Sequence, residues 1–271
     1  MTGKQFRKRI YQFYEKSGRD FPWRSADASP WGILVSEFML QQTQTSRVCD
    51  YWKHWLELWP HPADFAGAPL SHALREWSGL GYNRRCLNLH KTAAIIAEEH
   101  GGIVPRTPED LQKLPGIGAY TAGAIACFAY QHSSVFIETN IRAALIHCFF
   151  SNRMENPVHD DELVPILDAA LDRANPRLFY WALMDYGAAL KKAGQNAARN
   201  SVHYTRQSRF EGSFRQKRGA LLRSLSFSGP ADTSELQKRT GIEPEVIYEV
   251  MESLKTNMMV AELEGVYMVK D

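Results

Sequence analysis

The chain has few of the features that mark membrane, secreted or metal-binding proteins. Its four cysteines stand far apart, mostly inside apolar segments, which fits neither a disulfide framework nor metal-ligand spacing. The apolar run over residues 122–130 is far too short to cross a membrane, and the first eight residues lack the apolar core of a signal peptide. We therefore expect a cytoplasmic, monomeric protein with no membrane partner and no bound metal.

The chain also has little excess of one charge over the other, since its 32 Lys or Arg and 30 Asp or Glu give a net charge of only +2. The exception is residues 189–223, which hold nine Lys or Arg and a single acidic residue, whereas residues 224–271 are acidic. A segment this unbalanced is more typical of a polyanion contact than of a solvated surface. It predicts a nucleic-acid partner, with Arg206 and Arg209 among the contacts.

Helical periodicity covers most of the chain, and no convincing strand precedes residue 224. We expect helices over residues 4–17, one or two within 32–58, and then over 70–77, 84–99, 108–114, 119–130, 139–149, 160–173 and 176–192. Three short helices (214–225, 234–240 and 244–255) come before residues 259–269, which alternate around a glycine turn and predict a β-hairpin. The expected fold class is therefore all-α, with a helical domain over residues 1–205 and a basic connector plus winged-helix-like domain over residues 206–271.

The string Leu-Pro-Gly-Ile-Gly-Ala-Tyr-Thr-Ala-Gly at residues 114–123 joins two of these helices. Its glycines, Gly116 and Gly118, permit positive φ and the close approach of another backbone. The amides at the start of the second helix would then form a phosphate site. A bare Gly-x-Gly fits any helix–turn–helix corner, but the whole string resembles the helix–hairpin–helix of the DNA glycosylase superfamily.

Two carboxylates, Glu37 and Glu138, stand in contrasting surroundings along the sequence. Glu37 interrupts an apolar helix, where an acid has a raised pKa and can donate a proton. Glu138 stands at a helix start, where the dipole and free amides favour the ionised form. Cleavage of a glycosidic bond uses such a pair, one to protonate the leaving group and one to stabilise the cationic sugar. The plain alternatives are a satisfied core acid and a capping residue.

Three further strings resemble adenine-DNA glycosylases of the MutY type. They are Leu-Val-Ser-Glu-Phe-Met-Leu-Gln-Gln-Thr-Gln at 34–44, Gly-Leu-Gly-Tyr at 79–82 and Asn-Leu-His-Lys at 88–91. The likeness spans about residues 5–190. It implies a helix–hairpin–helix enzyme of base excision repair that flips a mispaired base out of double-stranded DNA. The implied target is adenine opposite guanine or oxidised guanine.

The resemblance also assigns roles to single residues. Glu37 matches the acid that protonates adenine N7 and then helps to activate water. Tyr120 matches a position that holds lysine in bifunctional relatives, so base removal without strand cleavage is implied. Asn140 matches an asparagine beside the sugar. Gln42 and Tyr82 match residues inserted into the helix around the lesion pair.

Three more residues are expected to contact DNA. Gln41 belongs to a polar run that can hydrogen-bond base edges. Arg24 falls near the mouth of the pocket in the family pattern, and Arg142 closes the string Ile-Glu-Thr-Asn-Ile-Arg that begins at residue 137.

The chain departs from the family pattern at three places. The family has aspartate where this chain has Glu138. It usually has four cysteines for a 4Fe–4S cluster after the helix that ends near residue 192, but residues 189–223 contain none, so we expect no cluster there. A winged-helix-like domain stands in place of the domain that senses oxidised guanine.

Two other functions stay open. One is a glycosylase for uracil or thymine opposite guanine, in which Glu37 would have no N7 to protonate. The other is a DNA-binding protein that has lost catalysis through the change at Glu138. The sequence sets neither the base removed nor the preferred opposite base.

Overall fold

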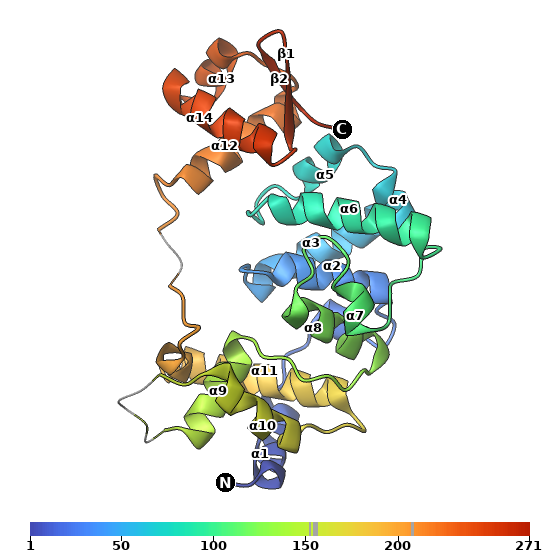
Figure 1. Cartoon of the computed structure of the whole chain (residues 1–271), viewed down its shortest axis with the longest axis vertical. Coiled ribbons are helices and arrows are strands. Elements are labelled where there is room, and N and C mark those ends of the chain that lie inside the picture. Colours follow the sequence, from blue (N-terminus) through green and yellow to red (C-terminus); the bar gives the residue numbers. More distant parts are fainter. Residues whose placement is uncertain (152, 154–156, 207–208) are drawn as a thin grey trace. The chain divides into compact units, whose positions relative to one another are not determined.

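A computed structural model describes residues 1–151, 153, 157–206 and 209–271. The described residues are predominantly helical, and the strands among them form a two-stranded sheet near the C-terminus (Figure 1). The helices are α1 (Gly3–Ser17), α2 (Pro30–Leu40), α3 (Thr45–Leu58), α4 (Pro62–Ala66), α5 (Leu70–Glu76), α6 (Arg84–Glu99), α7 (Pro108–Leu111), α8 (Ala119–Tyr130), α9 (Thr139–Phe149), α10 (Asp160–Ala170), α11 (Pro176–Lys192), α12 (Phe214–Ser228), α13 (Thr233–Thr240) and α14 (Pro244–Thr256). The predicted fold class is confirmed.

The chain divides into two compact units. Unit 1 comprises residues 1–33, 105–113 and 117–206, and unit 2 comprises residues 34–104, 114–116 and 207–271. The division of the sequence at residues 205 and 206 into two domains stays a prediction. No helix among the described residues has both the length and the apolar character that a membrane span needs.

Unit 1 is built around α1, α9 and α11, whose apolar faces meet in one core. Phe6 and Ile10 contribute from α1, Leu145 from α9, and Phe179 and Tyr180 from α11, all fully buried. Fully burying a side chain of this kind stabilises the fold by about 1.5–3 kcal/mol. This core holds the N-terminus of α9, where Glu138 lies.

Helix α10 ends earlier than the periodicity predicts, at Ala170 rather than near residue 173. The Arg7 guanidinium donates hydrogen bonds of 2.8 Å to the carbonyl oxygens of both Ala170 and Leu171. These bonds satisfy carbonyls that a longer helix would have paired internally. A side chain from α1 therefore sets the end of α10.

The first part of unit 2 has an aromatic core. The Trp55 ring lies 4.6 Å from Trp59, 4.8 Å from Phe65 and 5.5 Å from Trp77, measured between centroids. Phe65 comes from α4, a five-residue helix that was not predicted. Helix α4 is too short to show a helical period, and it is held by packing against α6.

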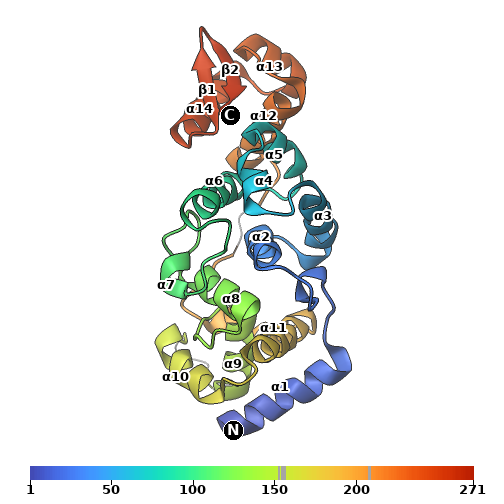
Figure 2. The same ribbon diagram turned by 90° about the vertical axis from the view of Figure 1, so that its right-hand side faces the viewer.

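The C-terminal part of unit 2 consists of α12, α13, α14 and the antiparallel strands β1 (Val260–Leu263) and β2 (Val266–Val269). Val260 pairs with Val269 and Leu263 with Val266, so the predicted three helices and hairpin are confirmed. These elements gather in one compact group that packs through α12 against α5 (Figure 2). We call residues 209–271 the C-terminal group.

Candidate functional site

The helix–hairpin–helix turn is shaped by side chains of α6. Gly116 has a φ of +80°, and a Cβ atom there would lie 2.7 Å from the Asn88 side-chain nitrogen. The Thr92 hydroxyl donates a 3.0 Å hydrogen bond to the Pro115 carbonyl oxygen. Gly116 therefore needs both the positive φ and the space, although the close neighbour is a side chain rather than the backbone we expected.

Gly118 has a different role from Gly116. Its φ is −86°, and an added Cβ atom would meet no protein atom within 4 Å. Neither strain nor packing thus requires glycine here, and the expected positive φ is absent. Gly118 is exposed at the N-terminus of α8, so its lack of a side chain leaves room for a ligand at those amides.

Glu138 is the N-cap residue of α9. Its Oε1 atom accepts hydrogen bonds from the backbone amides of Asn140 (2.7 Å) and Ile141 (2.9 Å). The Asn140 side chain donates from Nδ2 to the second carboxylate oxygen of Glu138 (3.2 Å). In turn, the Lys191 ammonium donates a 3.1 Å hydrogen bond to Asn140 Oδ1. Asn140 thus links the carboxylate to a cation from α11.

This linkage depends on a close crossing of α9 and α11. A Cβ atom at Gly187 would lie only 2.0 Å from the Asn140 carbonyl oxygen, so only glycine fits there. The crossing places Lys191, one helical turn further along α11, beside Asn140. Gly187 therefore acts as a positioning residue for Glu138 and Asn140.

Burial raises the pKa of the Glu138 carboxyl above its ordinary value. The amides of Asn140 and Ile141, the Lys191 charge and the Asn140 side chain lower the pKa, but they do not fully offset burial. The helix terminus acts on the carboxylate as the sequence predicted, but burial outweighs it. Glu138 is therefore a buried, hydrogen-bonded carboxyl group with a raised pKa, rather than an ordinary solvated helix cap.

Tyr120 lies in the first turn of α8, half-buried against the core of unit 1. Its ring meets Phe136 edge-on at 5.9 Å between centroids. Gly123, one turn further along α8, gives Phe136 the space to pack, because a Cβ atom there would lie 3.0 Å from that ring. The tyrosine is therefore held by packing rather than left loose at the surface.

Arg24 and Arg142, two of the arginines that were expected to contact DNA, both have carboxylate partners. Arg24 donates two 2.9 Å hydrogen bonds to Asp185, which also forms an ion pair with Arg19. Although burial raises it, the Arg24 and Arg19 guanidiniums hold the pKa of Asp185 below its ordinary value. Arg142 forms a bidentate pair with Asp160 at 2.7 and 2.6 Å. Their contact with DNA stays a prediction.

Glu37 lies in unit 2, on the last turns of α2. Residues 31–39 are all buried, and the Glu37 residue is only 5% exposed. Its neighbours along the helix include Val35 and Phe38, both fully buried. The acid is thus buried within an apolar helix, as the sequence predicted.

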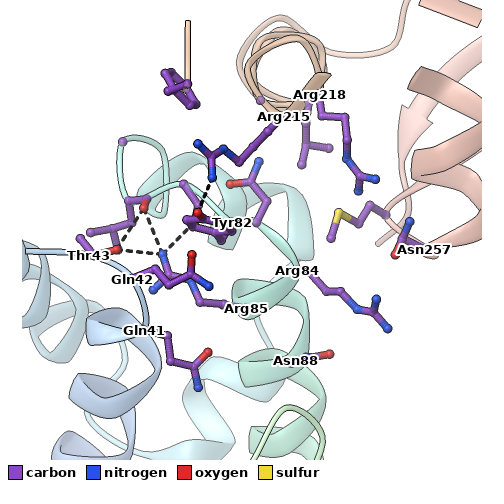
Figure 3. Close-up of a pocket in the computed structure, with 18 of the residues that line it drawn as sticks. Gln41, Gln42, Thr43, Tyr82, Arg84, Arg85, Asn88, Arg215, Arg218 and Asn257 are labelled. Atoms are coloured by element: carbon purple, nitrogen blue, oxygen red, sulfur yellow. Dashed lines mark hydrogen bonds between the residues drawn. The ribbon is translucent and has the colours of Figure 1, made fainter. Parts of the chain in front are cut away.

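Gln42 and Tyr82, the two residues expected to enter the DNA helix, share an uncommon backbone conformation. Their φ values are +58° and +50°, a left-handed region that non-glycine residues adopt only where their surroundings hold them. Both line one pocket of unit 2 (Figure 3). We call residues 41–44 and 79–85 the wedge loops.

Arg85 ties the two wedge loops together from beneath. It is 7% exposed, and its guanidinium donates to the carbonyl oxygens of Phe38 and Met39 (both 2.8 Å), to Leu80 (3.0 Å) and to Gly81 (2.9 Å). It also donates to the Thr43 hydroxyl oxygen at 3.0 Å. Burial lowers the pKa of this guanidinium to about 10. One buried cation therefore fixes the end of α2 relative to the Tyr82 loop.

The remaining predicted contacts lie at the surface or the rim of the pocket. Gln41 is half-buried and lines the pocket with Gln42. Arg206 and Arg209 are exposed, and Arg209 pairs with Glu211 at 3.1 Å. A surface pair of this kind contributes little stability, so a phosphate could displace it.

Sequence reasoning missed Arg85, Gly187 and Lys191 as parts of the site. Arg85 reads as an ordinary charged residue in the first turn of α6, and Lys191 as one of many lysines in the basic segment. The only available signal was Gly187, a glycine inside a long helix, which often marks a close approach.

The four cysteines lie on separate helices, and the absence of an iron–sulfur cluster stays a prediction. Such a cluster takes four thiolates that converge on one site. Cys49, Cys86, Cys127 and Cys148 lie on four different helices, two in each unit, and Cys86 and Cys127 are buried. No group of three His, Cys, Asp or Glu side chains in the described part of the chain could hold a metal ion.

Residues 35–193, more than half of the chain, match the family described as HhH-GPD superfamily base excision DNA repair protein. The chain is 41% identical over 181 residues to a protein of Mycolicibacterium smegmatis named adenine DNA glycosylase, covering 67% of this chain and 61% of that one. A human protein of the same name is 33% identical over 249 residues, covering 87% of this chain and 44% of that one. The chain thus spans about half the length of the curated relatives it matches.

Solved structures agree with this likeness. A thermostable thymine-DNA glycosylase matches with a TM-score of 0.61 at 25% identity, over 69% of this chain and 86% of that one. A complex of endonuclease III with DNA matches with a TM-score of 0.55 at 19% identity, over 68% and 85% of the two chains, which bears on the fold alone. The predicted helix–hairpin–helix fold is confirmed, and the relatives' names agree with the resemblance predicted from residues 34–44.

Proposed function

Because the chain belongs to the HhH-GPD superfamily of base excision DNA repair proteins, we propose that it is a DNA N-glycosylase that removes a mispaired adenine by hydrolysis. The observation that carries this proposal is the pair of carboxylates in contrasting settings. Glu37 is buried on an apolar helix, and Glu138 caps α9 with hydrogen bonds to its amides. The names of the relatives support adenine as the base.

Glu37 supplies the proton. Departure of a purine from its sugar is assisted by a proton on N7, and Glu37 is the buried acid that would donate it. The same carboxylate then accepts a proton from the attacking water. Gln42 and Tyr82 fill the helix while the adenine is out of the stack.

Glu138 supplies the negative charge that the cationic sugar needs. Its geometry is fixed before the reaction by the Asn140 and Ile141 amides, so little reorganisation accompanies bond breaking. Asn140 keeps the carboxylate oriented, and Lys191 keeps Asn140 oriented. Phosphates of the duplex bind at the turn between Gly116 and α8.

The protein acts on double-stranded DNA as a monomer in the cytoplasm and works without a 4Fe–4S cluster. The position of the cysteines on separate helices supports the last point. The opposite base is guanine or oxidised guanine, as the resemblance implies. Arg206 and Arg209 add contacts to the phosphates.

Removal of thymine or uracil opposite guanine is the second candidate, supported by the likeness to a thymine-DNA glycosylase. The third is a DNA-binding protein without activity. A panel of labelled duplexes separates the three: adenine, uracil, thymine and hypoxanthine are placed opposite guanine or oxidised guanine, and alkali reveals abasic sites. We expect alkali to cleave the strand at positions that held a mispaired adenine. Loss of thymine or uracil alone would favour the second candidate, and no base loss at all would favour the third.

The excised product should be an intact strand that carries an abasic site. Tyr120 has no amine, so a Schiff base cannot form at this position. Borohydride added during turnover is therefore expected to trap no covalent complex, as seen by denaturing electrophoresis. Tyr120→Lys provides the matched variant, in which trapping becomes chemically available. A stoichiometric adduct with the natural protein would contradict the monofunctional proposal.

A further inference from the structure

A pocket of about 760 Å³ lies within unit 2, between the wedge loops and the C-terminal group. One wall comes from residues 41–44 and 79–88, and the other from residues 210–222 with Leu254, Asn257 and Met259. Figure 3 shows side chains from both walls pointing into the same space. The chemistry proposed at Glu37 and Glu138 makes no use of this pocket.

The charged side chains that line the pocket are all arginines: Arg47, Arg84, Arg85, Arg215 and Arg218. No Asp or Glu is among its described lining residues. Burial and the nearby Arg84 both lower the pKa of Arg218, so these guanidiniums repel one another. Arg215 and Arg218 of α12 belong to the basic segment of residues 189–223, whereas residues 224–271 are acidic overall.

The other lining groups suit a nucleotide. Amide side chains of Gln41, Asn88 and Asn257 can hydrogen-bond the edge of a base. Phe210 and Phe214 offer rings for stacking at the same side as the arginines. Guanidiniums match phosphate oxygens in geometry as well as in charge.

Tyr82 is held between guanidiniums from two parts of unit 2. Arg215 of α12 lies over the Tyr82 ring, 4.9 Å from its centroid, and donates a hydrogen bond to the Tyr82 hydroxyl. Arg85 lies 5.6 Å from the same centroid, and Phe210 packs on Arg215 at 5.3 Å. The C-terminal group therefore contacts the wedge residue itself.

We propose that this pocket binds a nucleotide of the DNA next to the wedge, with Arg84, Arg215 and Arg218 on its phosphates. Helix α12 is then the element through which the C-terminal group binds the substrate. Arg215 is in addition a positioning residue for Tyr82. The inference rests on the proposed function in taking DNA as the ligand and Gln42 and Tyr82 as the residues that enter it, but its test needs no base removal.

The test measures duplex binding by the double variant Arg215→Ala/Arg218→Ala of the full chain. Fluorescence anisotropy gives the affinity at a range of salt concentrations. An undamaged duplex and one with a stable abasic-site analogue serve as probes, so no excision is needed. Loss of two phosphate contacts should weaken binding by about tenfold or more and reduce the slope of log affinity against log salt by about two. Thermal unfolding checks that the variant is folded.

Two matched variants separate this effect from a general loss of charge. Lys238→Ala/Lys270→Ala removes the same charge from exposed positions of the C-terminal group outside the pocket, and it should change affinity less than about threefold. Arg215→Lys/Arg218→Lys keeps the charge and should restore most of the salt slope but not the full affinity. Equal weakening by both alanine pairs, or by neither, would overturn the proposal.

A free nucleotide, rather than a nucleotide of the duplex, would offer the pocket the same base and phosphate groups. Titration with dAMP in place of DNA should show only millimolar binding, because a single phosphate engages few of the arginines. Tight binding of dAMP that the Arg215→Ala/Arg218→Ala pair abolishes, with duplex affinity unchanged, would show a small-molecule site instead. If the duplex panel shows no excision but the pocket variants still differ in duplex binding, the function proposal fails and this one stands.

Discussion

Glu37→Gln is expected to abolish base excision while leaving duplex affinity nearly unchanged. Glutamine keeps the shape of the side chain and its burial on α2 but cannot give a proton to the leaving adenine. General acid catalysis is typically worth about 10²–10⁴ in rate, so the single-turnover rate should fall by at least a hundredfold. Rates are measured with excess protein on the adenine mispair, and affinity by anisotropy on the same duplex.

Glu99→Gln is the matched control for this variant. Glu99 ends α6 in the same unit but is exposed, so the control makes the same Glu-to-Gln change without touching the buried acid. Its excision rate should equal that of the natural protein. A loss of less than about tenfold in Glu37→Gln would fall below the range of general acid catalysis and remove Glu37 from that role.

Glu138→Gln is expected to reduce excision by about two or more orders of magnitude, comparable to the removal of an oxyanion-hole donor. The amide oxygen can still accept from the Asn140 and Ile141 amides, so the cap of α9 survives. What disappears is the negative charge beside the sugar. Equal activity of this variant and the natural protein would contradict the role of Glu138.

Glu138→Asp is the sharper comparison, because aspartate is the residue that the resemblance leads one to expect. Aspartate is a favourable N-cap residue, and it retains the charge. We expect it to support excision. If neither the natural protein nor the Glu138→Asp variant acts on any mispair, the DNA-binding protein without activity becomes the better account.

The raised pKa of Glu138 predicts opposite effects of pH on activity and on stability. Excision requires the carboxylate, so the rate should fall on acidification at a higher pH than an ordinary glutamate would give. Folding disfavours the ionised form, because the pKa is higher in the folded than in the unfolded chain. The folded protein therefore loses stability as pH rises through the folded pKa. At pH values above it, Glu138→Gln should be at least as stable to heat as the natural protein.

Much of the fold was predictable because the signals are local. Helices α6, α8, α9 and α11 begin and end where the sequence predicts, since glycine, proline and capping residues stand at their ends. The β-hairpin follows from simple alternation around Gly265. The turn at residues 114–118 follows from its two glycines, although only Gly116 takes the positive φ.

Local signals failed where a distant side chain decides the outcome. The end of α10 depends on Arg7, more than 160 residues away in the chain. Helix α4 depends on burying Phe65 among tryptophans rather than on any period of its own. In both places the helix propensity of the segment is a weak term beside the tertiary contact.

The sequence by itself singled out the residues that we propose carry the chemistry: the acid within residues 34–44, the cap at Glu138 and the turn before α8. Only the tertiary structure decided how they are supported. Lys191 reaches Asn140 because Gly187 lets two helices touch, and Arg215 reaches Tyr82 across 133 residues of chain. A motif is read from neighbouring residues, whereas a partner from another element is chosen by packing, of which the local sequence showed only the glycine at position 187.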